Sequence, residues 1–272
     1  MSGELGAGEL SGQTILVTGA ASGIGFAYAE VSARNGAALV LLDRDADGLE
    51  AKAAELRAAG TEVATFTVDI SDPAQVDAAF DEIQERFEVD GAFLNAGVNR
   101  TVSPRLPDGA IDVASREDWR RVMSINLDGL FFTLQRTAGL MKPRGRGTIV
   151  VTGSTAGLRP EPLIGYAYTA SKHAVHGLCR QAAIDLAPFG VRLNVIAPGS
   201  FSTNIAGPTP PPAARTEMWT KSIPLGRLGQ TPELQELALL LISQTRSSFM
   251  TGGVYVIDGG ASALTQITTE SL

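Results

Sequence analysis

Short apolar segments that alternate with longer helix-forming segments constrain the fold of this chain more than any other feature. Thr14–Thr18 is rich in β-branched and aliphatic residues, and the segment that follows it, Phe26–Asn35, has the composition of a helix. The same order recurs along the chain, and strands that alternate with helices join into a parallel sheet through crossover connections. The expected strands are Thr14–Thr18, Leu39–Leu42, Val63–Val68, Ala92–Leu94, Thr148–Thr152, Val191–Ile196 and Val254–Ile257.

Most of these strands are continuous apolar runs, which is typical of strands whose two faces are both covered by helices. We therefore expect a single doubly wound α/β domain over residues 1–272, with a seven-stranded parallel sheet flanked by helices. Residues 1–12 precede the first strand, and we expect them to form a loose tail. The expected helices are Phe26–Asn35, Asp47–Ala59, one that begins near Pro73, Ser115–Met141, Ala167–Ala187 and Glu233–Ser243.

Composition excludes several classes of partner. The net charge is −7 and no basic stripe is visible, so we expect no nucleic-acid surface. The longest aliphatic runs, Ala37–Leu42 and Leu237–Ile242, are far shorter than the roughly 20 residues that span a bilayer, so we expect no membrane association. The first residues lack the pattern of a signal peptide, and the single cysteine, Cys179, cannot form an internal disulfide. These features favour the cytoplasm.

Polar or conformationally special residues follow six of the expected strands. Because the carboxyl ends of parallel strands lie at the same edge of a sheet, these residues should meet in one crevice, where open α/β sheets bind ligands. They are Gly19, Asp43, Asp69, Asn95, Ser154 and Pro198.

A glycine-rich segment connects the first strand to the first helix. Glycines at this place let the backbone turn tightly and approach a pyrophosphate, which then rests on the helix N-terminus. The spacing is Gly-x-x-x-Gly-x-Gly, not the commoner Gly-x-Gly-x-x-Gly, and a plain glycine-rich turn is the alternative. The residues expected to hold a dinucleotide are Gly19, Ser22, Gly23, Ile24 and Gly25.

Asp43 stands at the end of the second expected strand. A carboxylate there hydrogen-bonds the ribose hydroxyl groups of a dinucleotide and repels a 2′-phosphate, so Asp43 favours NAD over NADP. The neighbouring Arg44 is able to reach such a phosphate, and NADP therefore stays as the second possibility. The alternative for Asp43 is a solvated loop acid.

Tyr168 and Lys172 stand four residues apart on one face of an expected helix, in line with its apolar stripe. A nearby ammonium group favours the ionised form of a phenol, whose free pKa is about 10. A tyrosine tuned in this way can exchange a proton with an alcohol or a ketone. Tyr166 is the competing tyrosine, but Ala170 stands where its lysine would have to be.

Asn126 falls within an apolar stripe of the expected helix Ser115–Met141, and a buried amide costs free energy unless it is hydrogen-bonded. It either satisfies backbone groups or takes part in the reaction, and the two roles are compatible. Two adjacent hydroxyl groups, on Ser154 and Thr155, follow the fifth expected strand, and either can serve as a hydrogen-bond donor to a substrate.

His173 and His176 lie on the same expected helix as Tyr168. They are the only histidines, and no cluster of ligands surrounds them in the sequence. We expect structural or interfacial roles for both and no metal site.

These segments together resemble the short-chain dehydrogenase/reductase family, and the resemblance extends from Gln13 to Gly260. One departure is Leu94, since the family pattern often has an asparagine before Asn95. The resemblance implies a Rossmann-type fold and a nicotinamide dinucleotide cofactor. The motifs that carry it are TGAASGIG from Thr18, DI at Asp69, NAG at Asn95, an asparagine at position 126, GSTAG from Gly153, YTASK from Tyr168 and APGSFST from Ala197.

The resemblance also implies roles that spacing alone does not assign. In the catalytic group, the spacing to Gly157 in the family motif favours Ser154 over Thr155, and Asn126 positions a water that relays protons to Lys172. On the cofactor side, the resemblance implies that Asp69 and Ile70 contact the adenine and that Lys172 holds the nicotinamide ribose. Pro198 and Gly199 shape the nicotinamide site, and Thr203 hydrogen-bonds the carboxamide. The other residues implied to bind the cofactor are Asn95, Ala96, Gly97 and Tyr168.

We therefore expect an NAD-dependent oxidoreductase that interconverts a small-molecule secondary alcohol and a ketone, with Tyr168 as general acid and base. The alternatives are an NADP-dependent ketoreductase, a non-catalytic NAD-binding sensor or scaffold, and an epimerase or dehydratase that retains its cofactor. The substrate is a sugar, a polyol, a cyclic alcohol or a 3-hydroxyacyl compound. We expect two long stretches to line the substrate pocket. They are Val98–Ala114 and residues 200–227, the second of which contains Phe201, Met218 and Trp219.

Apolar residues of Ser115–Met141 occur on more than one face of the expected helix, so that helix needs cover on several sides. The resemblance implies that this helix and the Tyr168 helix pack across a subunit interface. We expect a homotetramer, with a dimer as the alternative.

Overall fold

A seven-stranded sheet forms the centre of the molecule. The computed structural model describes residues 8–99, 102–203, 205, 217 and 219–264. Every neighbouring pair of strands is parallel, in the order β3-β2-β1-β4-β5-β6-β7, which confirms the expected doubly wound sheet. The strands are β1 (Thr14–Thr18), β2 (Ala38–Asp43), β3 (Val63–Thr67), β4 (Val89–Leu94), β5 (Gly147–Thr152), β6 (Val191–Pro198) and β7 (Val254–Ile257).

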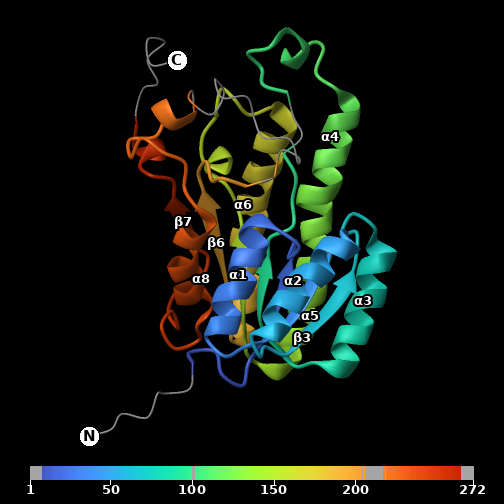
Figure 1. The fold of residues 1–272 in the computed structure, drawn as a ribbon. Coiled ribbons are helices and arrows are strands. Elements are labelled where there is room, and N and C mark those ends of the chain that lie inside the picture. Colours follow the sequence, from blue (N-terminus) through green and yellow to red (C-terminus); the bar gives the residue numbers. More distant parts are fainter. Residues whose placement is uncertain (1–7, 100–101, 204, 206–216, 218, 265–272) are drawn as a thin grey trace, which may run out of the picture.

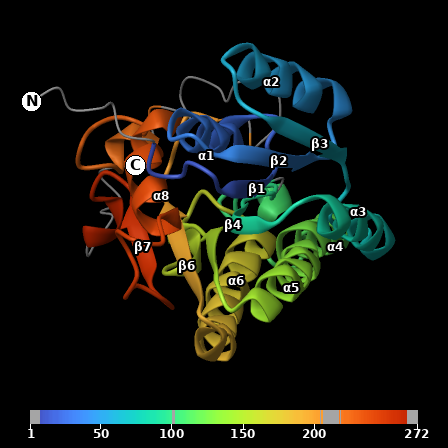
Figure 2. The same ribbon diagram turned by 90° about the horizontal axis from the view of Figure 1, so that it is seen from below.

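Helices cover both faces of this sheet (Figure 2). Helices α1, α2 and α8 lie on one face, and α3, α4, α5 and α6 lie on the other. The helices are α1 (Gly23–Arg34), α2 (Ala46–Ala58), α3 (Pro73–Arg86), α4 (Arg116–Met123), α5 (Leu130–Met141), α6 (Tyr166–Leu186) and α8 (Gln235–Ile242).

Each face of the sheet has its own apolar core. Tyr28 of α1 and Leu41 of β2 are buried on one face, whereas Phe80 of α3 and Leu134 of α5 are buried on the other. Each fully buried side chain of this size contributes about 1.5–3 kcal/mol of transfer free energy. Burial on both faces explains why the strands appear in the sequence as continuous apolar runs.

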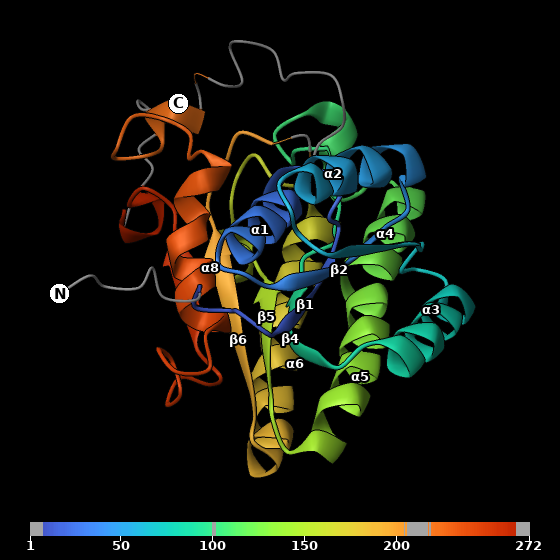
Figure 3. The ribbon, with the colours of Figure 1, turned by 60° about the horizontal axis from the view of Figure 1, so that its bottom comes forward.

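The carboxyl ends of the strands point to the upper edge of the sheet in Figure 1. The segment between β4 and α4, drawn in green, rises above this edge. Figure 3 shows α1 and α2 in front of the strands, with α4 and α5 following each other on the far side. Loops from both halves of the chain therefore meet at one edge, where the expected crevice should lie.

The helix expected over Ser115–Met141 is interrupted. The chain forms α4, then a π-helical turn over Ser124–Gly129, and then α5. At Gly129 the backbone lies against Ile70, and an added Cβ atom would come within 2.8 Å of the Ile70 side chain. A local change of helical pitch leaves the apolar pattern largely intact, so the sequence pattern does not reveal it.

Strand β4 begins at Val89, three residues before the expected start. The strand therefore includes Asp90, whose charge argues against a buried strand. Asp90 is nevertheless buried, because its Oδ1 accepts a hydrogen bond of 2.7 Å from Arg144 and its Oδ2 one of 3.1 Å from the backbone N–H of Thr14. The cations that pair with Asp90, Arg144 and Arg146, are distant from it in the sequence.

The expectation of a loose tail over residues 1–12 is wrong for residues 8–12, while residues 1–7 lie outside the described residues. Leu10 is fully buried, and its backbone N–H donates to the carbonyl oxygen of Asn35 at 2.9 Å. A single leucine was too small a signal among the polar and glycine residues around it.

Asp90 also supplies a test of what holds the edge of β4 together. Replacing Asp90 with Ala should lower the free energy of unfolding by about 3 kcal/mol, because Arg144 then loses its buried ionic partner. Urea denaturation of the purified protein measures this difference. The matched control is Asp185→Ala, which removes the exposed ion pair with Lys142 and should cost less than about 1 kcal/mol. Equal losses for the two variants would contradict the structural role of Asp90.

Candidate active site

A cavity of about 550 Å³ opens at the carboxyl edge of the sheet. It brings together residues from loops after six of the strands, which confirms the expected crevice. Gly25 and Asn126 are not among its lining residues. The site residues expected from the sequence that line the cavity are Gly19, Ser22, Gly23, Ile24, Asp43, Asp69, Ile70, Asn95, Ala96, Gly97, Ser154, Tyr168, Lys172, Pro198, Gly199 and Thr203.

The turn between β1 and α1 depends on its glycines. Gly19 has φ +70° and Gly23 has φ +57°, values that residues with a side chain rarely adopt. A Cβ atom on Gly25 would overlap the carbonyl group of Gly19, so Gly25 packs the helix against the turn and does not face the cavity. Ser22 precedes α1 without capping it through its side chain, which leaves the backbone N–H groups of the first turn available to an anion.

Asp43 braces the same turn from the end of β2. Its Oδ2 accepts a hydrogen bond from the backbone N–H of Ala21, and its Oδ1 accepts one from Asp45, both at 3.0 Å. These contacts fix the carboxylate at the wall of the cavity. Arg44 also lines the cavity, so the structure places the two candidate determinants of cofactor choice side by side.

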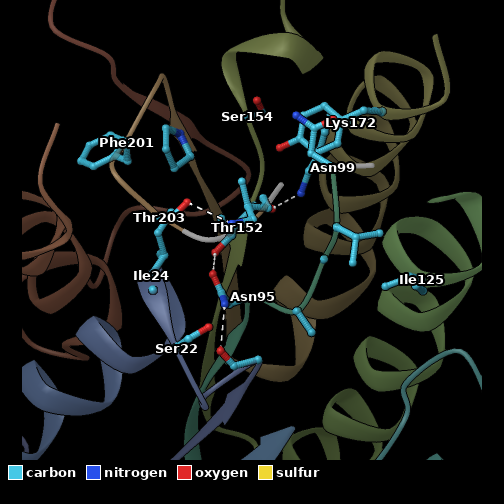
Figure 4. Close-up of a pocket in the computed structure, with 18 of the residues that line it drawn as sticks. Ser22, Ile24, Asn95, Asn99, Ile125, Thr152, Ser154, Lys172, Phe201 and Thr203 are labelled. Atoms are coloured by element: carbon cyan, nitrogen blue, oxygen red, sulfur yellow. Dashed lines mark hydrogen bonds between the residues drawn. The ribbon is translucent and has the colours of Figure 1, made fainter. Parts of the chain in front are cut away.

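A chain of hydrogen bonds connects the glycine-rich turn with the catalytic end of the cavity (Figure 4). Thr18 Oγ1 accepts from the backbone N–H groups of Asn95 and Ala96, at 2.9 and 3.1 Å. Thr152 Oγ1 donates to Asn95 Oδ1 at 2.9 Å, and Lys172 Nζ donates to the carbonyl oxygen of Thr152 at 2.9 Å. The ends of β1, β4 and β5 are thus linked to α6. Sequence reasoning assigned no role to Thr152.

Ser154, Tyr168 and Lys172 gather at the other end of the cavity. Figure 4 shows Ser154 and Lys172 there, with Ser22 and Ile24 at the opposite end. Lys172 Nζ lies 5.6 Å from the centroid of the Tyr168 ring. The two side chains therefore share the helix face that their spacing predicts.

Burial dominates the electrostatics of this end. It raises the pKa of Tyr168 to about 12, against the effect of a hydrogen bond with Ser154, and it lowers the pKa of Lys172 to about 8. Burial is the largest of these effects, so the Lys172 ammonium group does not by itself bring the tyrosine toward neutrality. Positive charge close to the hydroxyl group is needed to ionise Tyr168 at moderate pH.

A family model described as Enoyl-(Acyl carrier protein) reductase matches residues 19–262. The chain belongs to the short-chain dehydrogenase/reductase family. The match includes the glycine-rich turn, the Tyr168–Lys172 helix and every strand from β2 to β7.

Named relatives of the chain act on diverse compounds. The levodione reductase of Leifsonia aquatica is 37% identical over 92% of this chain and 94% of its own. The galactitol 2-dehydrogenase (L-tagatose-forming) of Cereibacter sphaeroides is 36% identical over 93% of this chain and 96% of its own. A solved structure that is similar to this chain is the crystal structure of a gluconate 5-dehydrogenase from Burkholderia cenocepacia J2315 in complex with NADP and tartrate. The TM-score is 0.86 and the sequence identity is 33%, and the similarity covers 94% of this chain and 97% of that one.

In this family member, Asn126 lies behind the wall of the cavity, within the π-helical turn. Its Oδ1 accepts from the backbone N–H of Val98 at 2.8 Å, and its Nδ2 donates to the carbonyl oxygen of Val98 at 2.9 Å and to Ser171 Oγ at 3.2 Å. Ser171 Oγ in turn donates to the carbonyl oxygen of Tyr168 at 2.8 Å. Asn126 thus satisfies backbone groups, and it connects the loop after β4 with the turn of α6 that carries Tyr168.

His176 is a residue whose role near the site the sequence did not indicate. Its ring is buried beneath the loop after β5, where a Cβ atom on Gly153 or Gly157 would collide with it. Burial lowers the pKa of His176 to about 4, so the ring is neutral, and Nε2 accepts from the backbone N–H of Ser154 at 3.4 Å. Only the two glycines hint at this packing. Among the described residues, no group of three or more His, Cys, Asp or Glu side chains is placed to hold a metal ion.

The structure separates the two candidate hydroxyl groups. The Ser154 side chain acts on the pKa of Tyr168 and lowers it, whereas Thr155 Oγ1 donates to Glu161 at 2.5 Å. Glu161 also lines the cavity and was not among the expected residues. Ser154 is thus the hydroxyl group that adjoins the tyrosine.

The two long loops contribute to the cavity as expected. Val98 and Asn99 come from the first, and Phe201, Ile205 and Trp219 come from the second, while Met218 lies outside the described residues. No helix in the described part of the chain combines the length and the apolar character that a bilayer crossing requires.

Proposed function

We propose that this protein is an NAD-dependent oxidoreductase that interconverts a secondary alcohol and a ketone. The observation that carries the proposal is that Ser154, Tyr168 and Lys172 line the same cavity as the glycine-rich turn after β1. Membership of the family supports it, and the relatives named above are called dehydrogenases or a reductase.

The residues of the cavity fit a nicotinamide dinucleotide. The positive φ angles of Gly19 and Gly23 open a cradle at the start of α1 that suits a pyrophosphate. The residues that would hold the rest of the cofactor are Asp43 at a ribose, Asp69 and Ile70 at the adenine, Asn95, Ala96 and Gly97 along its length, and Lys172, Pro198, Gly199 and Thr203 at the nicotinamide end.

When bound, the oxidised nicotinamide supplies the acceptor for the hydride that leaves the carbinol carbon. Ser154 and Tyr168 orient the substrate by hydrogen bonds to its oxygen, and Tyr168 accepts the hydroxyl proton. Lys172, held by the carbonyl oxygen of Thr152, places its positive charge near the phenolate that forms. Asn126 keeps the turn of α6 in place. It belongs to the π-helical turn, whose backbone can bind a water that relays protons to Lys172. In the opposite direction Tyr168 donates its proton to the ketone oxygen.

Replacing Tyr168 with Phe should lower kcat by about 10²–10⁴-fold, because the proton that moves in the reaction loses its carrier. The dissociation constant of the cofactor should change little, since the aromatic ring stays. Absorbance of the reduced nicotinamide over a panel of secondary alcohols measures kcat, and fluorescence titration measures cofactor binding. The matched control is Tyr166→Phe, because Tyr166 does not line the cavity.

The sign of the pH dependence follows from the same residue. Since burial raises the pKa of Tyr168, the protonated form predominates at low pH and serves ketone reduction, whereas the ionised form serves alcohol oxidation. Oxidation should become faster as pH rises, and reduction should become slower. Retained turnover in Tyr168→Phe, or the same pH slope in both directions, would refute the assignment.

Asp43 is the proposed determinant of the preference for NAD. Replacing it with Ser should lower the ratio of kcat/KM with NAD to kcat/KM with NADP by about 10–100-fold, the effect of losing a hydrogen bond to a charged group and the repulsion of a 2′-phosphate. Steady-state kinetics with both cofactors give this ratio. Because Asp43 also braces the turn, loss of activity with both cofactors is compatible with the proposal, and only the ratio decides.

Asp47→Ser, an exposed position in the first turn of α2, serves as the control and should leave the ratio unchanged. If the wild type prefers NADP and the variant Arg44→Ala does not, then Arg44 and not Asp43 determines the choice of cofactor.

We propose further that the protein forms a homotetramer through the helices on the α4–α6 face. Three large apolar side chains there are exposed: Trp119 of α4 by 44%, Phe131 of α5 by 45% and Ile184 of α6 by 70%. Light scattering over a dilution series should give the mass of a tetramer, and Phe131→Glu should shift it to a smaller species, because a charge cannot be buried at such a contact without a partner. A monomer at every concentration contradicts the proposal, and a dimer reduces it to one interface.

A further inference from the structure

A carboxylate lies at the catalytic end of the cavity, where the proposed reaction does not use it. Glu161 belongs to the loop between β5 and α6 and lines the cavity together with Ser154, Thr155 and Tyr168. Its charge adds to the effect of burial in raising the pKa of Tyr168, so the two side chains are within electrostatic reach of each other.

One hydrogen bond holds the carboxylate, and two others hold the backbone of its loop. Thr155 Oγ1 donates to Glu161 Oε1 at 2.5 Å, and the backbone N–H of Ile164 donates to the Glu161 carbonyl oxygen at 3.0 Å. From the segment between β4 and α4, buried Ser103 donates its hydroxyl to the carbonyl oxygen of Pro162 at 2.9 Å. A carboxylate fixed in this way does not need to be ordered when a ligand arrives.

The described residues provide no cation to balance this charge. None of their ion pairs includes Glu161. Arg159, two residues away, donates instead to the carbonyl oxygen of Leu264 at 3.3 Å, and its charge acts on Asp258. Lys172 is directed to Thr152. The cavity thus presents a negative group to whatever binds beside Tyr168.

Apolar side chains also line the cavity, while Asn99 lies beside Lys172 in Figure 4. Ile164, Phe201, Ile205 and Trp219 line the cavity, and Phe201 lies at the same end as Ser154 in Figure 4. A ligand that fits such a site has a hydrocarbon surface and a hydrogen-bond donor, because an ionised carboxylate only accepts hydrogen bonds.

We propose that Glu161 selects uncharged substrates that carry a second hydroxyl group on the carbon next to the carbinol, and that it excludes substrates with a carboxylate or phosphate at that place. This inference rests on the proposed oxidation of a secondary alcohol. Glu161 accepts a hydrogen bond from the second hydroxyl group, while Ser154 and Tyr168 hold the first. A negative group in the same position meets repulsion across a poorly solvated cavity.

The test compares three alcohols on one carbon frame: cyclohexanol, cyclohexane-1,2-diol and 2-hydroxycyclohexanecarboxylate. The quantity of interest is kcat/KM of each substituted alcohol relative to that of cyclohexanol, so that general effects on catalysis divide out. In Glu161→Gln, which keeps the shape and removes the charge, the relative value for the diol should fall by about 10-fold and that for the carboxylate should rise by about 10-fold. In the control Glu236→Gln, an exposed residue of α8, both ratios should stay as in the wild type.

Glu161→Asp supplies a second variant, because it keeps the charge and should keep the exclusion of the carboxylate. Ratios in Glu161→Gln that equal those of the wild type overturn the inference and leave the proposed oxidoreductase intact. Titration calorimetry of the same compounds with the protein and reduced NAD separates the two proposals. If no alcohol is oxidised, the proposed function fails. The role of Glu161 is then still supported if the wild type binds the diol more tightly than the carboxylate and Glu161→Gln loses this difference. Equal binding overturns it.

Discussion

The hydrogen bonds that run from Thr18 through Asn95 and Thr152 to Lys172 are the interaction on which the rest of the site depends. Each bond joins the end of one strand to the next strand or to α6, so these hydrogen bonds cross the sheet edge from the glycine-rich turn to Lys172. A parallel sheet brings these ends to one edge, but it does not set their side chains in register. The three polar side chains do so, and they hold the glycine-rich turn and helix α6 in a fixed relation.

Buried charge is the second constraint on the site. Tyr168 and Lys172 are both buried, and burial disfavours the ionised form of each, so Tyr168 does not ionise merely by adjoining Lys172. Glu161 opposes ionisation of Tyr168 further. In the proposed reaction, the positive charge of the oxidised cofactor adds to that of Lys172. A site that ionises its base only when both charges are present discourages proton transfer before the cofactor binds.

Local patterns in the sequence predicted the sheet and the cavity well. The strands are apolar because both faces are covered, and the residues that follow them meet because the strands are parallel. Features that depend on distant partners were not predictable in this way. Asp90 is buried because of Arg144, Leu10 is buried against α1, and the π-helical turn at Ser124–Gly129 leaves the apolar pattern almost unchanged. The positions of Glu161 and His176 beside Ser154 likewise depend on how loops fold over the sheet edge, which the sequence spacing does not encode.

The position of Glu161 on a loop, and not on the sheet, has an evolutionary consequence. Its codon becomes that of glutamine or lysine by a single nucleotide change. The two backbone contacts that hold the loop do not involve the side chain that changes, whereas the hydrogen bond from Thr155 Oγ1 does. A descendant of this protein can therefore invert the charge that its substrate meets while the Thr18–Lys172 hydrogen bonds stay as they are. The substrate preference of this protein can therefore change through Glu161 while the residues proposed to carry the reaction stay the same.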